Sequence, residues 1–382
     1  MKSIYLDYNA STQVDNSVLE AMLPFFTENY CNPSNTLHEY GAKALEAIEN
    51  SQEIIARYLG VFPEDIVFTS GATESNNLAI RGVLEASGKD RKHIITSKIE
   101  HPSVIETCAA LERRGVTVTY VPVDKNGLVS IEDIRNSITD NTLLISIMAA
   151  NNEIGTIQPI EEIGDLAVRE NILFHTDATQ YFPTGRTDLR KIKADLISFS
   201  GHKFYGPKGV GCLYINSDRV KIEPQIWGGR HQRNIRSGTM NVPSIVGIGV
   251  ATDILYRNAE KENLRIANLR DTLLKLISKE NPIIVNGSMI DRIPSNLNIT
   301  IPGVSALALT AIVPDVIFSA GSACSVSSKN VSYVLKSVGL DDESIKCSIR
   351  LSLGKFTTED EIQYAAKKLT AGINMLFKLP AA

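Results

Sequence analysis

The sequence has little that suits a protein that binds membranes or nucleic acids. Its 382 residues carry 39 Lys and Arg against 43 Asp and Glu, a net charge of −4, so there is no basic excess for phosphate backbones. The most apolar stretches, residues 242–251 and 306–313, are too short to span a bilayer. Asp7 interrupts any apolar run at the N-terminus, which excludes a signal-peptide core. We expect a soluble, cytoplasmic protein with no membrane and no direct nucleic-acid partner.

Cysteine is also scarce. The five cysteines are an odd number and contain no CxxC pair, so they resemble neither a disulfide framework nor a zinc site. Reduced thiols are the default interpretation, and at least one of them could be reactive.

What the chain does have is an ordinary globular composition. Hydrophobic residues make up 43% and charged residues 21% of the sequence, which excludes a disordered or fibrous chain. At this length two domains are expected, and the hydrophobic core is large enough to fold without disulfide bonds or a structural metal.

Short β-rich runs alternate with amphipathic helical stretches between residues 64 and 216. This alternation predicts an α/β domain around a mainly parallel sheet, in which ligands gather at the carboxyl ends of the strands. A long helical stretch follows from about residue 246 to 279, and residues 282–382 predict a smaller α+β domain. We divide the chain into an N-terminal segment that packs with the small domain (1–14), a large domain (15–255) and the small domain (256–382). The predicted strands are residues 66–69, 93–96, 116–121, 143–148, 172–175, 196–198, 211–215, 295–301 and 348–353. The predicted helices include residues 75–85, 102–113, 131–138, 160–169, 332–337 and 359–376.

Lys203 lies in a loop rich in Gly and Pro just after a predicted strand. A lysine removed from water has a lowered pKa and can act as an amine nucleophile or form a Schiff base, although a lone loop lysine is more often a surface residue. Asp177 follows another strand, and its carboxylate could pair with a pyridinium nitrogen. Taken alone, the same residue is better interpreted as a helix cap or a turn residue. Thr73 follows Gly71 at a helix start, where free backbone N–H groups can bind an anion. A capping box, which would only stabilise the helix start, is the simpler interpretation of the same residues.

Several motifs together resemble one family, the NifS/IscS-type cysteine desulfurases of the class V aminotransferases. They occur in order at residues 5–12, 69–76, 100–101, 151–155, 177–180, 200–203, 236–239, 321–324 and 349–354, and they cover nearly the whole chain. The resemblance implies a homodimeric enzyme of the aspartate-aminotransferase-like fold (PLP fold type I) with pyridoxal 5'-phosphate as cofactor.

The resemblance also implies a role for each matching residue. Lys203 would hold the cofactor as a Schiff base, Asp177 would pair with its ring nitrogen, and His101 would stack on the ring and shuttle protons. Arg350 would bind the substrate carboxylate together with Asn152, since the planar guanidinium suits a carboxylate. The other cofactor contacts would come from Ala72, Thr73, Asn152, Gln180, Ser200, His202 and, from the other subunit, Thr239.

Cys324 would be the residue that takes the sulfur. It lies among small and hydroxyl residues, which favours an exposed loop, whereas Cys108 and Cys212 sit in apolar surroundings typical of packing. The resemblance implies that L-cysteine becomes L-alanine while its sulfur passes to Cys324 as a persulfide. An acceptor protein would then receive it, in iron–sulfur cluster assembly, tRNA thiolation or DNA sulfur modification. No resident metal is expected, with Cys324 a possible transient iron–sulfur ligand.

Two other functions stay open at this point. A selenocysteine lyase would share the fold and the cofactor chemistry. A cofactor-binding scaffold without turnover is disfavoured, because both Lys203 and Cys324 are present. The roles of Cys31 and Cys347 are undecided.

Overall fold

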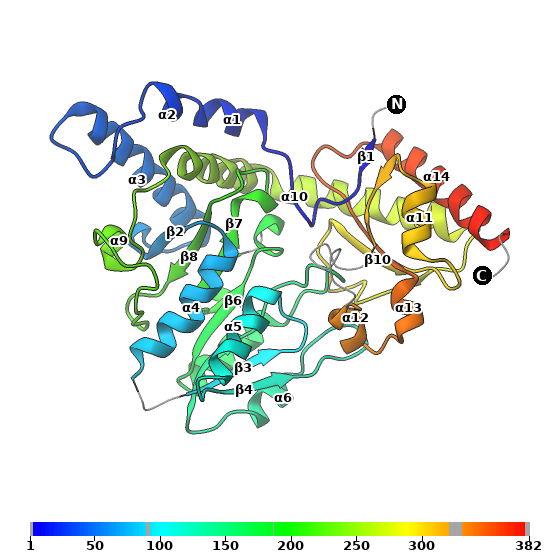
Figure 1. Cartoon of the computed structure of the whole chain (residues 1–382), viewed down its shortest axis with the longest axis horizontal. Helices are drawn as coiled ribbons and strands as arrows, with labels where there is room; N and C mark the ends of the chain where they lie inside the picture. The colour runs from blue at the N-terminus through cyan, green and yellow to red at the C-terminus, as the bar shows by residue number, and fades with distance from the viewer. Residues whose placement is uncertain (1–2, 89–91, 186, 321–330, 379–382) are drawn as a thin grey trace.

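The structure, a computed structural model, describes residues 3–88, 92–185, 187–320 and 331–378. Figure 1 shows a larger part built around a central sheet and a smaller part beside it, with the long helix α10 (Val242–Ser278) running along both. The expected α/β architecture with a smaller α+β part is thereby confirmed. Residue 255, where we divide the domains, lies within α10, and that division stays a prediction.

The central sheet has seven strands in the order β2-β8-β7-β6-β5-β3-β4. Strand β8 runs antiparallel to both of its neighbours, β2 and β7, and the other neighbouring strands of this sheet pair in parallel, so the sheet is mainly parallel, as predicted. The strands are β2 (Ile66–Thr69), β3 (His93–Ser97), β4 (Thr117–Val121), β5 (Thr142–Ser146), β6 (Leu173–Asp177), β7 (Leu196–Ser200) and β8 (Gly211–Ile215).

Helices cover both faces of this sheet. Because side chains alternate along a strand, Ile94 packs with α4 (Ala72–Ala86) and α5 (Pro102–Glu112), whereas Ile95 belongs to the cluster on the opposite face. That second face is covered by α3 (Glu39–Leu59), α7 (Ile160–Arg169) and the first half of α10. The other helices of the larger part are α1 (Asn16–Met22), α2 (Pro24–Thr27), α6 (Ile131–Asn136), α8 (Leu189–Ile192) and α9 (His231–Asn234), with short 3-10 turns η1 (Pro63–Asp65), η2 (Phe182–Thr184) and η3 (Gly201–Lys203).

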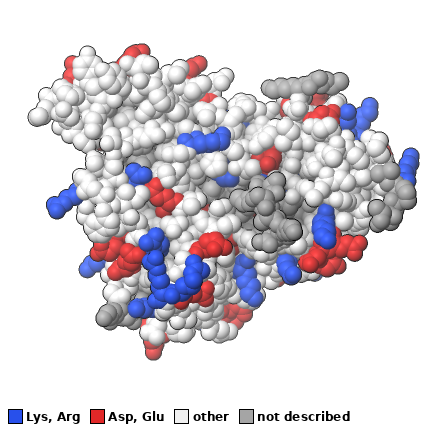
Figure 2. Space-filling view, in the orientation of Figure 1, with Lys and Arg blue, Asp and Glu red and all other residues white. Residues whose placement is uncertain are grey.

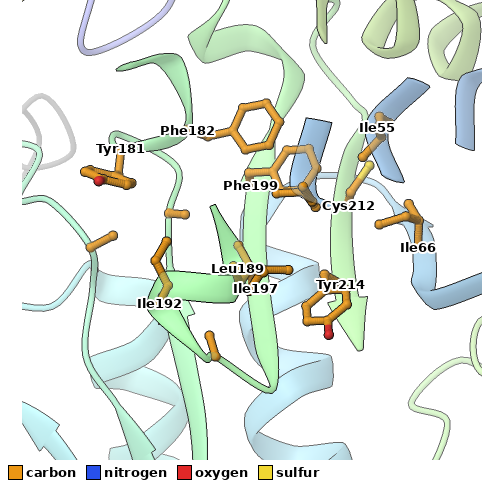
Figure 3. Packing of buried hydrophobic residues seen from close by; sticks show 14 of the residues in the cluster. Ile55, Ile66, Tyr181, Phe182, Leu189, Ile192, Ile197, Phe199, Cys212 and Tyr214 are labelled. Atoms are coloured by element: carbon orange, nitrogen blue, oxygen red, sulfur yellow. The ribbon is translucent and has the colours of Figure 1, made fainter. Parts of the chain in front are cut away.

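The core next to β7 and β8 is aromatic. Phe182 stacks on Phe199 with ring centroids 4.0 Å apart, and Cys212 lies close by among Ile55 and Ile66 (Figure 3). Burial raises the pKa of the Cys212 thiol well above its ordinary value. Cys108 is equally buried, and burial raises its pKa to about 12. Both thiols are therefore inert packing residues, as the sequence predicted.

The smaller part contains a four-stranded antiparallel sheet in the order β12-β13-β10-β9. The N-terminal segment joins this part, because β1 (Ile4–Tyr5) pairs in parallel with β11 (Val316–Ile317) and Leu6 is buried in its core. Its other elements are β9 (Ile284–Val285), β10 (Asn296–Thr300), α11 (Ala306–Ile312), β12 (Ser319–Ala320), α12 (Tyr333–Ser337), α13 (Asp342–Lys346), β13 (Ser348–Ser352) and α14 (Glu359–Lys378).

The surface carries both signs of charge. In the view of Figure 2, Lys and Arg are interspersed with Asp and Glu, and neither sign dominates this face. Within the described ranges, no helix combines the length and the apolar character that crossing a membrane requires.

Candidate active site

A cavity of about 680 Å³ opens at the carboxyl edge of the central sheet. The ends of β6 and β7, the start of α4, the N-terminal segment and β13 all contribute to its wall. Apart from Thr239, every predicted site residue that the structure describes lines this cavity: Ala72, Thr73, His101, Asn152, Asp177, Gln180, Ser200, His202, Lys203 and Arg350. Cys324 lies outside the described residues.

Asp177 is the carboxylate at the end of β6. It is 5% exposed and accepts two hydrogen bonds, from Asn76 Nδ2 at 2.8 Å and from the backbone N–H of Thr179 at 2.9 Å. These two donors fix the carboxylate against the cavity wall. Thr179 lines the same cavity, and its buried Oγ1 has no hydrogen-bond partner among the described residues.

His101 caps the N-terminus of α5. Its Nδ1 accepts the backbone N–H of Ser103 at 3.2 Å and lies 2.8 Å from Ser103 Oγ. Burial lowers the pKa of His101, the charge of Asp177 opposes this effect, and the charge of Lys203 adds to it. The imidazole is therefore held mainly neutral near pH 7.

The other end of the cavity suits an anion. Helix α4 starts after Gly71, whose φ of 149° favours glycine, and within the described chain no side chain caps this helix. Its first N–H groups and its dipole are therefore available beside Thr73 and Ser200. His202 lines the same cavity, and burial, aided by the charges of Lys203 and Lys208, lowers its pKa to about 4.

Lys203 extends from η3 toward the N-terminal segment. Its Nζ donates to the carbonyl oxygens of Asn9 at 2.6 Å and Ala10 at 2.9 Å. The Nε2 of Gln180 donates to the same Asn9 oxygen at 3.0 Å. The N-terminal segment therefore forms one wall of the site and holds the lysine amine.

Arg350 lies on β13 and is only 2% exposed. One terminal nitrogen donates to Asp7 at 2.7 Å and to Ser319 Oγ at 3.0 Å, and the other donates to the backbone oxygen of Asn152 at 3.0 Å. The ion pair with Asp7 joins the N-terminal segment to the small part and fixes the guanidinium at the cavity. Sequence reasoning missed this role of Asp7, although Asp7 lies in one of the motifs.

These residues fit pyridoxal phosphate. The start of α4, which no side chain of the described residues caps, suits the phosphate, and the fixed Asp177 carboxylate suits a ring nitrogen that carries a proton. Thr179 Oγ1, for which the described residues supply no partner, leaves a polar atom for a ligand. Lys203 supplies the amine that a Schiff base requires.

Thr239 is the predicted residue that the cavity does not include. It is exposed, in the segment after α9. Nearby Arg236 donates from Nε to Glu74 at 2.9 Å, and this ion pair ties the segment to the start of α4. This position is compatible with a contact made from one subunit into the cavity of another, which stays a prediction.

Comparisons with known proteins find similar sequences and similar solved structures. The aminotransferase class-V model matches residues 4–365. The chain is 43% identical over 378 residues to cysteine desulfurase IscS of Rickettsia prowazekii, covering 98% of this chain and 92% of that protein. Among solved structures, a NifS-like protein has a TM-score of 0.92 and 37% identity, covering 98% of this chain and all of that one. Another, SspA in complex with cysteine, has a TM-score of 0.83 and 38% identity, covering 93% of this chain and 100% of that chain.

Proposed function

This chain belongs to the aminotransferase class-V family and is a cysteine desulfurase of the aspartate-aminotransferase-like fold, and we propose how its own residues catalyse the reaction. The observation that carries the proposal is the single cavity that unites Lys203, Asp177, His101 and Arg350. L-cysteine is the substrate, and pyridoxal phosphate is the cofactor that the residues fit.

Each residue has a task that follows from its surroundings. Pyridoxal phosphate, when bound, supplies an electron sink for the charge that develops at the α carbon of the substrate. Asp177, held at the cavity wall by Asn76 and the Thr179 N–H, would keep the ring nitrogen of the bound cofactor protonated through its negative charge. Lys203 Nζ, which lines the cavity and is held at the carbonyl oxygens of Asn9 and Ala10, removes the α proton. Arg350, fixed by Asp7 and Ser319, holds the substrate carboxylate.

The sulfur step falls to Cys324. As a thiolate, it attacks the substrate sulfur, so that an S–S bond forms while the Cβ–S bond of the substrate breaks. The carbon fragment takes up a proton and leaves as L-alanine. The sulfur remains on Cys324 until an acceptor protein removes it.

The active unit in this proposal is a homodimer. Exposed apolar side chains gather in the segment from α1 to the start of α3, where Phe26, Tyr30 and Leu37 are 57%, 70% and 97% exposed. A surface of this kind suits burial against a second copy. Sedimentation analysis tests it, since a monomer at micromolar concentration would contradict the dimer.

The activity has a direct test. Purified protein loaded with pyridoxal phosphate and given L-cysteine with a reductant should yield alanine and sulfide in equal amounts. Cys324→Ser should bind the cofactor normally and lose this turnover. If Cys324→Ser turns over both cysteine and selenocysteine as fast as the unaltered protein, the chain acts as a selenocysteine lyase instead.

A further inference from the structure

A chain of hydrogen bonds connects His101 to Asp177 through two residues without an assigned role. Asn76 lies on α4 and Ser103 in the first turn of α5, two helices that lie side by side on one face of the sheet (Figure 1). Asn76 Nδ2 is 2.8 Å from Asp177 Oδ2 and 2.8 Å from Ser103 Oγ, and Ser103 Oγ is 2.8 Å from His101 Nδ1. Asn76 is fully buried and Ser103 is 8% exposed, so solvent does not compete for these bonds.

The direction of each bond follows from the chemistry of the donors. Only the amide NH₂ of Asn76 can face the Asp177 carboxylate, because turning the amide over would place oxygen against oxygen. The same nitrogen donates to Ser103 Oγ, which leaves the Ser103 hydroxyl hydrogen for His101 Nδ1. This orientation also explains why Asn76 Oδ1 is buried without a partner among the described residues.

The backbone supplies an independent indication. The N–H of Ser103 points at His101 Nδ1 over 3.2 Å, and a backbone N–H can only donate. Two donors therefore meet at Nδ1, which must be an acceptor. The ring proton is then on Nε2, the nitrogen left for the contents of the cavity.

We propose that Ser103 and Asn76 are positioning residues that hold His101 neutral, with its proton on Nε2, and couple its ring to the Asp177 carboxylate. In this form His101 Nε2 carries the ring proton and donates a hydrogen bond to a group in the cavity, while Lys203 acts as the base. The proposal deepens the proposed function, and its catalytic meaning rests on that function. The tautomer itself does not depend on that function.

Protonation of Nδ1 is costly in this arrangement. A proton on Nδ1 would face the Ser103 N–H, and the Ser103 hydroxyl would have to turn away from it. The charged groups that act on the ring are Asp177 at the end of β6, which favours the protonated form, and Lys203 in η3, which disfavours it. Because Asn76 donates a hydrogen bond to Asp177, the carboxylate's negative charge is partly compensated and stabilises a protonated His101 less.

Nitrogen-15 NMR of the holoenzyme labelled in its six histidines tests the tautomer directly. His101→Gln identifies the His101 signals by their loss. We expect an unprotonated Nδ1 and a protonated Nε2 at neutral pH, and this state should persist below pH 6.5, where an ordinary histidine becomes charged. A proton on Nδ1, or a ring already charged at neutral pH, would overturn the proposal.

Ser103 variants give a second readout. Ser103→Ala should raise the pKa of His101 by about half to one unit, the effect of losing one hydrogen bond to the neutral ring. Ser103→Thr keeps the hydroxyl and should restore the original titration, and Ser103 borders a second cavity of about 280 Å³ that offers room for a methyl group.

Thr107→Val is the matched control. It removes a hydroxyl one turn further along α5 that bonds to Ser103 O and Asn77 Oδ1, so the His101 titration should not change. Equal shifts in Ser103→Ala and Thr107→Val would contradict a specific role for Ser103. The titration needs no turnover, so a protein without desulfurase activity would overturn the proposed function and leave this inference intact.

Discussion

Replacing Asp177 with asparagine removes one charge from the cavity and changes little else in shape. The carboxylate serves two donors, Asn76 Nδ2 at 2.8 Å and the Thr179 N–H at 2.9 Å. An asparagine side chain has one oxygen for both of them, so one buried donor loses its partner. An unsatisfied buried donor costs about 1–3 kcal/mol, and we expect the free energy of unfolding to fall by that amount.

The larger effect of Asp177→Asn concerns the cofactor. A hydrogen bond to a charged group contributes about 1.5–3 kcal/mol, so loss of the carboxylate should weaken pyridoxal phosphate binding roughly ten- to a hundredfold. Turnover at saturating cofactor should fall on the order of a hundredfold, because the neutral amide no longer stabilises the ring proton. Absorbance titration with the cofactor and alanine production measure the two quantities.

The control is Asp195→Asn. Asp195 is 1% exposed and accepts the Phe174 N–H at 3.0 Å, but it does not line the cavity. This substitution should reduce stability and leave cofactor affinity unchanged. If Asp177→Asn matches it in cofactor affinity and turnover to within roughly twofold, the assignment of Asp177 is refuted.

Three further substitutions or treatments probe other parts of the structure. Arg350→Lys keeps the charge without the planar fork, so the KM for L-cysteine should rise about tenfold or more, while an unchanged KM would argue against carboxylate binding. Glu100 is fully buried, and burial raises its pKa to about 8. Its folded form therefore keeps a proton that the unfolded chain loses above about pH 4.3, so stability should decline as pH rises from there through 8, and Glu100→Gln should flatten this decline in denaturant titrations. A thiol reagent under native conditions should spare Cys108 and Cys212, which are buried in the core, and unfolding in denaturant should expose both; peptide mass mapping that finds Cys212 modified in folded protein would contradict the packing assignment.

Much of the sheet could be predicted because its strands are continuous apolar runs. Strand β8, for example, occupies Gly211–Ile215 as predicted, and every residue of it is buried. The helices before β2 were not predicted. The amphipathic pattern of α3 is present, with Ala44, Ile48, Ile55 and Leu59 buried along one stripe, and counting its period would have found it.

The candidate site shows a different limit. The sequence could place residues at strand ends, such as Asp177 and Ser200, at the ligand-binding edge of the sheet, because parallel strands present their carboxyl ends at one edge. The pairing of Arg350 with Asp7 joins residues 343 positions apart, and a local pattern carries no information about such a contact. Asn76 and Ser103 are ordinary helix-start residues in sequence, and only the packing of α4 against α5 reveals that they connect His101 to Asp177.

The central claim is that the sulfur of L-cysteine passes to Cys324. The most direct measurement is peptide mass mapping after brief treatment of the holoenzyme with L-cysteine and no reductant. The account predicts a gain of one sulfur atom on the peptide that contains Cys324, and no gain in Lys203→Ala. Extra sulfur found only on the peptides of Cys31 or Cys347, or on Cys324 in the Lys203→Ala protein as well, would contradict it.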